Sequence, residues 1–124
     1  MLEDYFKGLK LVVLDGEYAV VKSKRFYEDA FANIKDEREI TVIIKESKVK
    51  KKDVIALEND FKIFTFDTII PFNLIGFIAK IAEILSKQNI SIFTISTFTT
   101  EYVLVKKKDL PDTIKSLKKL GVKV

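Results

Sequence analysis

Residues 89–108 read NISIFTISTFTTEYVLVKKK, and this stretch decides the fold class. It contains two apolar, β-branched runs, which are typical of strands, joined by the polar corner Thr99-Thr100-Glu101. Apolar residues recur at helical spacing in residues 72–87 before it and in residues 109–120 after it. This order predicts an α+β fold built on a β-α-β-β-α-β unit.

Composition limits the chemistry that the chain can perform. Its 124 residues, 48% of them hydrophobic, suffice for one compact unit or for two small units that share a core. The chain has no Cys and no His, which removes thiol nucleophiles, cysteine metal sites, and the commonest general base and metal ligand. A mechanism that uses only carboxylates or lysines stays open. We therefore expect no enzyme, no catalytic residue, no metal site and no cofactor.

Charge and hydropathy indicate a soluble protein. The first ten residues carry early acidic groups and no long apolar run, so no signal peptide is predicted. The most hydrophobic region, residues 69–85, is interrupted by Pro71, Lys80 and Glu83, which argues against a membrane span. We expect a cytoplasmic location without membrane contact. The net charge is +4, and lysines cluster at residues 45–52 and 106–108. These clusters are either a solvated surface or a surface that binds a polyanion.

The first half of the chain is rich in predicted strands. Residues 9–14 and 17–22 flank the turn dipeptide Asp15-Gly16, which predicts a hairpin. A β-branched strand is expected at residues 39–45. The polar residues 46–53 then form the expected boundary between two halves.

The second half begins with two short predicted strands and contains two helices. The strands are residues 54–57 and 61–67, separated by a turn at Glu58-Asn59-Asp60. Asn73 is a plausible N-cap of the first helix. Asp109 and Asp112 form a variant of the capping box at the second helix, and residues 122–124 can add a final strand.

The chain resembles the small tandem ACT-domain proteins, a group that includes the cytosolic arginine sensor of animal cells. The resemblance rests on ISIFTISTFTTEYVLVK, on the preceding PFNLIGFIAKIAEIL, and on LDGEYAVVK and FANIKDEREITVII nearer the start. It implies two ferredoxin-like ACT modules side by side, a reduced N-terminal one at residues 1–60 and a C-terminal one at residues 61–124. It also implies a regulatory sensor that holds an amino acid or another small effector at a module interface. Expected partners are a second copy in a homodimer and a regulated enzyme or other protein.

The resemblance also implies which residues bind the ligand. The helix start Asn73-Leu74-Ile75-Gly76 aligns with the loop that offers backbone groups to the ligand, and free N–H groups at the positive end of a helix favour a carboxylate. Ser96, Thr97 and Phe98 align with the strand and corner that close the pocket. Glu101 stands where relatives commonly have Asp, and an acid there could hold an ammonium group. Ile75 stands where relatives often have a hydroxyl residue.

Other functions and purely structural roles stay open for the same residues. Phe93, Phe98 and Tyr102 could stack nucleic-acid bases, although the strand signature of RNA-recognition domains is not present. A structural or assembly role without a ligand is a further alternative. Asn73 could simply cap a helix, and Glu101 could be a solvated residue at a hairpin tip.

Overall fold

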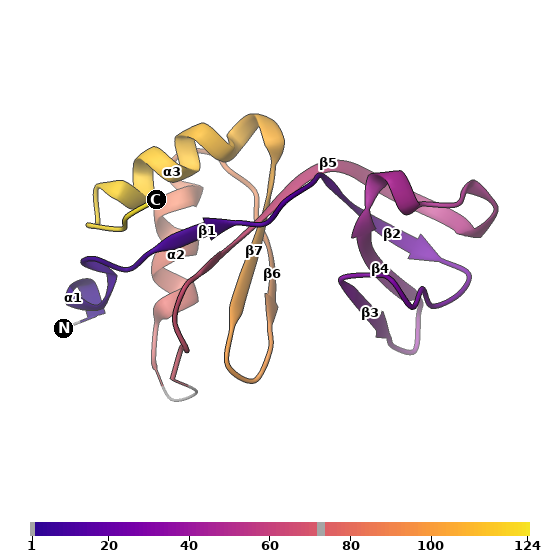
Figure 1. The fold of residues 1–124 in the computed structure, drawn as a ribbon, viewed down its shortest axis with the longest axis horizontal. Coiled ribbons are helices and arrows are strands. Elements are labelled where there is room, and N and C mark those ends of the chain that lie inside the picture. Colours follow the sequence, from indigo (N-terminus) through magenta and orange to yellow (C-terminus); the bar gives the residue numbers. More distant parts are fainter. Residues whose placement is uncertain (1, 72–73) are drawn as a thin grey trace. The chain divides into compact units, whose positions relative to one another are not determined.

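The computed structural model describes residues 2–71 and 74–124 (Figure 1). The chain divides into two compact units, which we call unit 1 (residues 1–14 and 62–124) and unit 2 (residues 15–61). Strand β5, Val54–Phe66, contributes residues to both. Residues 1–14 thus group with residues 62–124, and the assignment of one module to residues 1–60 and another to residues 61–124 stays a prediction. None of the described helices is long and apolar enough to cross a membrane.

Unit 1 is an α+β structure in which two helices pack on one face of an antiparallel sheet (Figure 1). Strand β5 is hydrogen-bonded to β7, and β7 pairs antiparallel with β6. The order strand, helix, strand, strand, helix is the predicted one. The other elements of the unit are α1 (Leu2–Phe6), β1 (Leu11–Val13), α2 (Phe77–Ser86), β6 (Phe93–Ser96), β7 (Glu101–Lys106), the 3-10 turn η3 (Lys107–Asp109) and α3 (Leu110–Lys118).

An aromatic cluster fixes the start of α2 against the core of unit 1. The ring of Phe77 stacks on that of Phe6 with centroids 5.0 Å apart, and it meets Phe66 of β5 edge-on at 5.3 Å. Offset and edge-on pairs of this kind add to the stabilisation from burial. Farther along α2, Ile81 and Leu85 are fully buried, as the predicted apolar face requires. The first turn of α2 is therefore held firmly next to the sheet.

The N-terminal strand is present as predicted, but the predicted final strand is not. Strand β1 pairs antiparallel with the end of β5, from Leu11 opposite Phe66 to Val13 opposite Phe64. The predicted final strand at residues 122–124 is reduced to one parallel bridge between Lys10 and Lys123. The prediction of a final strand was therefore wrong, because residues 122–124 make only this single bridge.

The polar corner between β6 and β7 lies two residues earlier than predicted. The two strands pair from Phe93 opposite Leu104 to Ser96 opposite Glu101, so residues 97–100 make the corner. The backbone N–H of Thr97 donates to the carbonyl oxygen of Thr100 at 2.8 Å and closes it. Glu101 is consequently the first residue of β7, held at a defined position in a strand.

The start of α2 differs from the prediction, whereas α3 begins after Asp109 as predicted but without the predicted side-chain cap. Helix α2 begins at Phe77, later than expected, and the predicted N-cap Asn73 lies outside the described residues. At α3, Asp109 makes no side-chain cap. Its backbone already has helical angles (φ −94°, ψ −6°), because the 3-10 turn η3 leads directly into the helix. The predicted capping box is therefore wrong.

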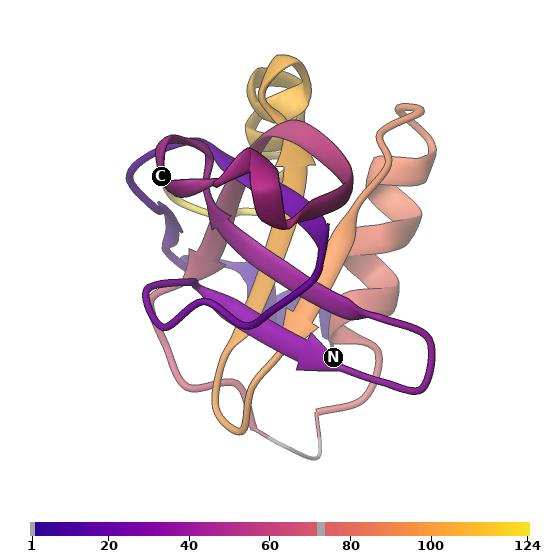
Figure 2. The ribbon, with the colours of Figure 1, turned by 90° about the vertical axis from the view of Figure 1, so that its right-hand side faces the viewer.

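Unit 2 is an antiparallel sheet without an α-helix in its described residues 15–61 (Figure 2). Its strands follow the order β3-β4-β2-β5. Alternate residues of β2 and β4, among them Val21 and Val42, pack with Tyr27 in a small buried cluster. The loop before β3 thus covers one face of the sheet of unit 2. The elements are β2 (Tyr18–Ser23), β3 (Ala32–Lys35), β4 (Ile40–Lys45) and the 3-10 turns η1 (Glu46–Lys48) and η2 (Lys51–Asp53).

Two predicted turns do not reverse the chain. The predicted hairpin around Asp15-Gly16 is wrong, since β1 and β2 both pair with β5. The predicted turn at Glu58-Asn59-Asp60 is also wrong, because β5 is continuous through it. Tyr18 lies opposite Phe61 and Val20 opposite Glu58, so two residues of β5 face one of β2 in a β-bulge. Asp60 takes the positive φ of 66° that this bulge uses.

A buried carboxylate joins the covering loop of unit 2 to its sheet. Asp53 accepts a hydrogen bond from the hydroxyl of Tyr27 at 2.6 Å and one from Nε of Arg25 at 2.9 Å. The bond from Tyr27 and the charge of Arg25 lower the pKa of Asp53, against the opposing effect of burial. Burial, and then the bond to Asp53, raise the pKa of Tyr27.

We predict that unit 2 loses stability in acid through Asp53. Because folding lowers the pKa of Asp53, its charge stabilises the fold above the ordinary carboxyl value of 3.8. This contribution disappears as the pH falls through the folded-state value. Urea unfolding should show that the free energy of unfolding of the wild type falls between neutral pH and pH 3. In Asp53→Asn this fall should be smaller, and the variant should be less stable than the wild type at neutral pH. The matched control is Asp112→Asn, because Asp112 is exposed. If Asp53→Asn loses as much stability in acid as Asp112→Asn and the wild type do, the prediction is contradicted.

Candidate functional site

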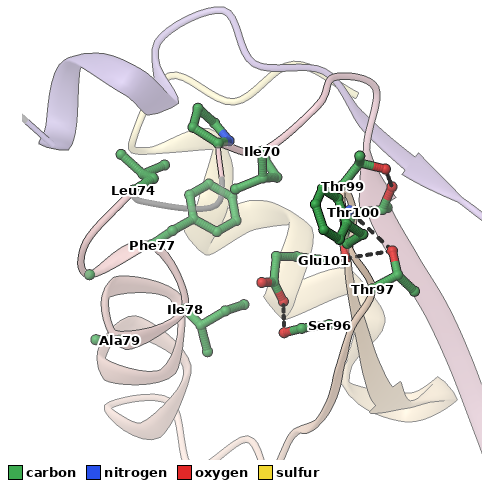
Figure 3. Close-up of a pocket in the computed structure, with 13 residues that line it drawn as sticks. Ile70, Leu74, Phe77, Ile78, Ala79, Ser96, Thr97, Thr99, Thr100 and Glu101 are labelled. Atoms are coloured by element: carbon green, nitrogen blue, oxygen red, sulfur yellow. Dashed lines mark hydrogen bonds between the residues drawn. The ribbon is translucent and has the colours of Figure 1, made fainter.

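A cavity of about 410 Å³ opens in unit 1 between the start of α2 and the β6–β7 corner (Figure 3). This volume falls within the range of roughly 300–1,000 Å³ that is typical of small-molecule sites. Glu101 is the single charged residue among its described lining residues. The lining consists of Ile70, Pro71, Leu74, Gly76, Phe77, Ile78, Ala79, Ser96, Thr97, Phe98, Thr99, Thr100 and Glu101.

The start of α2 lines this cavity through Gly76, Phe77, Ile78 and Ala79. Gly76 precedes the helix with a left-handed backbone (φ 87°, ψ 5°), which an ordinary side chain disfavours. The first intrahelical bond runs from the N–H of Lys80 to the carbonyl oxygen of Gly76 at 2.9 Å. The N–H groups of the preceding residues, Phe77 to Ala79, have no acceptor within the helix and lie at the positive end of its dipole. A carboxylate or another small anion is the natural ligand for such a group of donors.

The opposite wall holds the carboxylate of Glu101 in one orientation. The hydroxyl of Ser96 donates to Oε2 of Glu101 at 2.5 Å, across the β6–β7 pair. The backbone oxygen of Glu101 accepts from the hydroxyl of Thr65 at 2.7 Å, which ties it to β5. In Figure 3 the side chain of Glu101 extends from the strand toward α2, with Ile78 on the facing side. Its remaining lone pairs can accept hydrogen bonds from a ligand cation.

Hydroxyl residues shape the corner above Glu101. Oγ1 of Thr97 accepts from the N–H of Thr100 at 3.2 Å. The N–H of Ile70 donates to the carbonyl oxygen of Thr99 at 2.9 Å, which joins the corner to the segment that follows β5. Hydrogen bonds therefore fix the corner that forms one wall of the cavity. The apolar side chains of Leu74 and Phe77 also line the cavity.

The structure brings together most of the residues predicted for the site. Six of them line the cavity, whereas Ile75 is 89% exposed and does not line it. Asn73 lies outside the described residues. The six are Leu74, Gly76, Ser96, Thr97, Phe98 and Glu101.

Thr99 and Thr100 belong to the predicted polar corner, whereas Ala79, Ile70 and Pro71 were not predicted as site residues. Ala79 follows Gly76 by three positions, so helical spacing of small residues could have identified it. Ile70 and Pro71 reach the cavity through the backbone bond of Ile70 to Thr99. That contact between distant segments leaves no local pattern.

Comparison with solved structures shows several proteins of the same fold. A protein from Agrobacterium tumefaciens is 22% identical with a TM-score of 0.80, over 94% of this chain and 91% of that one. A protein of unknown function from Vibrio cholerae, described as a possible transport protein, is 17% identical with a TM-score of 0.77, over 97% and 95%. The regulatory subunit of aspartate kinase from Thermus thermophilus is 7% identical with a TM-score of 0.61, over 92% and 97%.

Comparison of the sequence with protein families is more specific. No curated protein matches the chain. The sequence model of the ACT domain matches residues 56–119, which include all of the cavity lining and slightly more than half of the 124 residues. The chain therefore belongs to the ACT domain family.

Proposed function

We propose that this protein is a regulatory effector-binding protein and that it holds an α-amino acid in the cavity between α2 and the β6–β7 corner. ACT domains are regulatory modules that take small effectors, and the likeness to aspartate kinase regulatory subunits supports a role of this kind. The observation that carries the proposal is the pairing of one oriented carboxylate, Glu101, with the N–H groups at the start of α2.

The two walls suit the two charges of an amino acid. Glu101 accepts hydrogen bonds from the ammonium group, and the N–H groups of Phe77 to Ala79 donate to the carboxylate. The ligand side chain then lies against Leu74 and Phe77. A monoamine or a monocarboxylate satisfies only one wall and leaves the other wall's groups desolvated without a partner, which costs affinity.

Two exposed apolar side chains, Phe98 in the cavity lining and Ile75 just before Gly76, are available to a second protein surface. Phe98 is 81% exposed and Ile75 is 89% exposed. In the proposed function a second ACT module or a regulated enzyme covers them and completes the ligand's enclosure, so that ligand occupancy changes the affinity for that partner. The partner would therefore bind with a different affinity when the effector is present, and this difference would regulate its activity.

A thermal-shift screen tests the proposal. The proteinogenic amino acids are added singly at millimolar concentration, together with the amine and the carboxylic acid that correspond to each hit. At 100 times the dissociation constant, a ligand adds about 2.7 kcal/mol to the stability of the folded state. We expect at least one amino acid to raise the melting temperature, and its two half-analogues to raise it much less. No shift with any amino acid, or an equal shift with a half-analogue, contradicts the proposal.

A further inference from the structure

A second cavity, of about 730 Å³, opens in unit 2 beside the covering loop, which comprises residues 24–31. This volume lies within the range of roughly 300–1,000 Å³ that is typical of small-molecule sites. None of the residues described as lining it also lines the cavity of unit 1. The lining comes from the covering loop, from β3 and from the segment of η1 and η2, and it consists of Arg25, Phe26, Tyr27, Glu28, Asp29, Asn33, Lys48 and Lys50.

Side-chain hydrogen bonds hold the covering loop in shape. The amide of Asn33 binds both backbone groups of Tyr27, since Oδ1 accepts from its N–H at 2.9 Å and Nδ2 donates to its carbonyl oxygen at 2.8 Å. Oγ of Ser23 likewise accepts from the N–H of Arg25 at 3.2 Å and donates to its carbonyl oxygen at 2.7 Å. The segment from Arg25 to Tyr27 is therefore fixed at both ends, and a wall formed in advance lowers the cost of binding a ligand.

The guanidinium group of Arg25 is held in one orientation at this wall. Its Nε donates to the buried carboxylate of Asp53 at 2.9 Å, and its Nη1 donates to the carbonyl oxygen of Phe26 at 2.9 Å. Its Cζ lies 4.0 Å from the centroid of the Tyr27 ring, a cation–π contact. The side chain of Arg25 is still 44% exposed. Because a guanidinium carries five N–H donors, the remaining ones are available to an anion.

The side of the cavity that the segment of η1 and η2 forms is basic. Residues 45–52 contain five lysines and a single acidic residue. Two of these lysines line the cavity. Lys48 lies 3.8 Å from the carboxylate of Asp29, whereas Lys50 has no carboxylate within ion-pair distance among the described residues. The cavity thus combines an unpaired ammonium group with an oriented guanidinium, and these two cations together suit a phosphate group.

An aromatic ring and a second kind of polar group complete the lining. Phe26 is 53% exposed, and an exposed ring beside cations is a surface on which nucleic-acid bases stack. Glu28 also lines the cavity, and no cation of the described part of the chain lies within ion-pair distance of it. A carboxylate can accept hydrogen bonds from the hydroxyl groups of a sugar. A phosphate, a flat ring and sugar hydroxyls occur together in a nucleotide.

We propose that the cavity of unit 2 binds a nucleoside monophosphate. Arg25 and Lys50 hold the phosphate group, and the base stacks on Phe26. Glu28 accepts hydrogen bonds from the ribose hydroxyls. Three of these four residues belong to the covering loop, so the segment that covers the sheet also carries the site.

A single nucleotide suits this surface better than a nucleic-acid chain does. Residues 15–61 contain more acidic than basic side chains, whereas domains that bind nucleic acids present a strongly basic surface. The carboxylates of Glu28 and Asp29 line the cavity and repel the further phosphates of a chain. The lining belongs to unit 2, so this inference does not rest on the amino acid proposed for unit 1.

Calorimetric titration of the 124-residue chain tests the proposal. The ligands are AMP, GMP, CMP and UMP, followed by the nucleoside of each nucleotide that binds and by inorganic phosphate. At least one nucleotide is expected to bind, and its two halves to bind at least about tenfold more weakly, because each half leaves part of the site unsatisfied. No binding of any nucleotide at millimolar concentration, or equal binding of either half, overturns the proposal. Binding of a short single-stranded RNA without binding of any nucleotide overturns it as well.

Lys50→Gln tests the phosphate contact. Removal of this charge should weaken nucleotide binding about tenfold. Lys51→Gln is the matched control, because Lys51 is the next residue, is exposed like Lys50, and is not among the described lining residues. It should bind the nucleotide as the wild type does. Equal affinities in the two variants overturn the assignment of the phosphate to this cavity.

Phe26→Ser tests the stacking contact. Loss of the ring should weaken nucleotide binding at least about fivefold and leave the binding of inorganic phosphate unchanged. Ile34→Ser is the matched control, because Ile34 is 45% exposed on β3 and is not among the described lining residues. If Phe26→Ser binds the nucleotide as tightly as Ile34→Ser does, the base does not stack on Phe26 and the proposal is overturned.

Discussion

Replacing Glu101 by Gln is expected to lower the affinity for the bound amino acid by at least about tenfold while it leaves the fold intact. The change keeps the size of the side chain and removes its charge. Hydrogen bonds to charged groups contribute roughly 1.5–3 kcal/mol, which corresponds to about 10- to 100-fold in affinity. Isothermal titration of wild type and Glu101→Gln with the amino acid found in the screen measures this difference.

The unfolding free energy of Glu101→Gln should stay within about 0.5 kcal/mol of the wild type, because an amide oxygen can still accept from Ser96. Glu83→Gln is the matched control. Glu83 lies on α2, is not among the described lining residues, and pairs with Lys80 at 3.5 Å and Lys87 at 3.7 Å. It should bind the ligand as the wild type does. Equal affinity in Glu101→Gln and Glu83→Gln would show that Glu101 does not hold the ammonium group.

Replacing Gly76 by Val is expected to lower both stability and ligand affinity. A left-handed backbone costs an ordinary residue about 1–2 kcal/mol, and a β-branched side chain is less tolerant still. A Cβ at this position would also lie 3.3 Å from the side chain of Leu2. We expect a loss of about 2 kcal/mol or more in the free energy of unfolding. Any relaxation of this backbone reorients the N–H groups at the start of α2 relative to Glu101.

The matched control for this change is Gly8→Val. Gly8 has a similar φ of 76°, but a Cβ there has no neighbour within 4 Å, and Gly8 does not line the cavity. Its variant should lose about 1–2 kcal/mol through backbone strain alone and bind the ligand with unchanged affinity. Chemical denaturation and calorimetric titration on both variants separate the two effects. If Gly76→Val binds as tightly as Gly8→Val, the conformation of Gly76 serves packing only.

Local patterns were sufficient to predict the two long helices, α2 and α3, and the strands β6 and β7 of unit 1. The wide apolar face of α2 and the β-branched runs of β6 and β7 identify helix and strands without reference to the rest of the chain. The expectation that Gly76 and Glu101 face each other came from the resemblance to ACT proteins, since no periodicity relates two residues so far apart. Their common cavity is a consequence of the order of elements.

The two failed turn predictions depend on contacts between distant segments. Asn59 and Asp60 are residues typical of turns, but β2 pairs with β5 on both sides of them. The two residues therefore form a β-bulge within the strand and do not reverse the chain. Asp15-Gly16 likewise suggests a hairpin, yet the strands on both sides of it, β1 and β2, pair with β5 and not with each other. Which strand pairs with which is decided by tertiary packing, and a local dipeptide does not report it.

Nuclear magnetic resonance titration with the amino acid selected by the screen tests the central claim most directly. Amide signals of the isotope-labelled chain are followed as the ligand is added. Binding in the cavity predicts that the largest shifts occur at the start of α2, from Gly76 to Ala79, and at the corner from Ser96 to Glu101. Shifts concentrated in unit 2, or no shifts at saturating ligand, would contradict the claim that this cavity is the effector site.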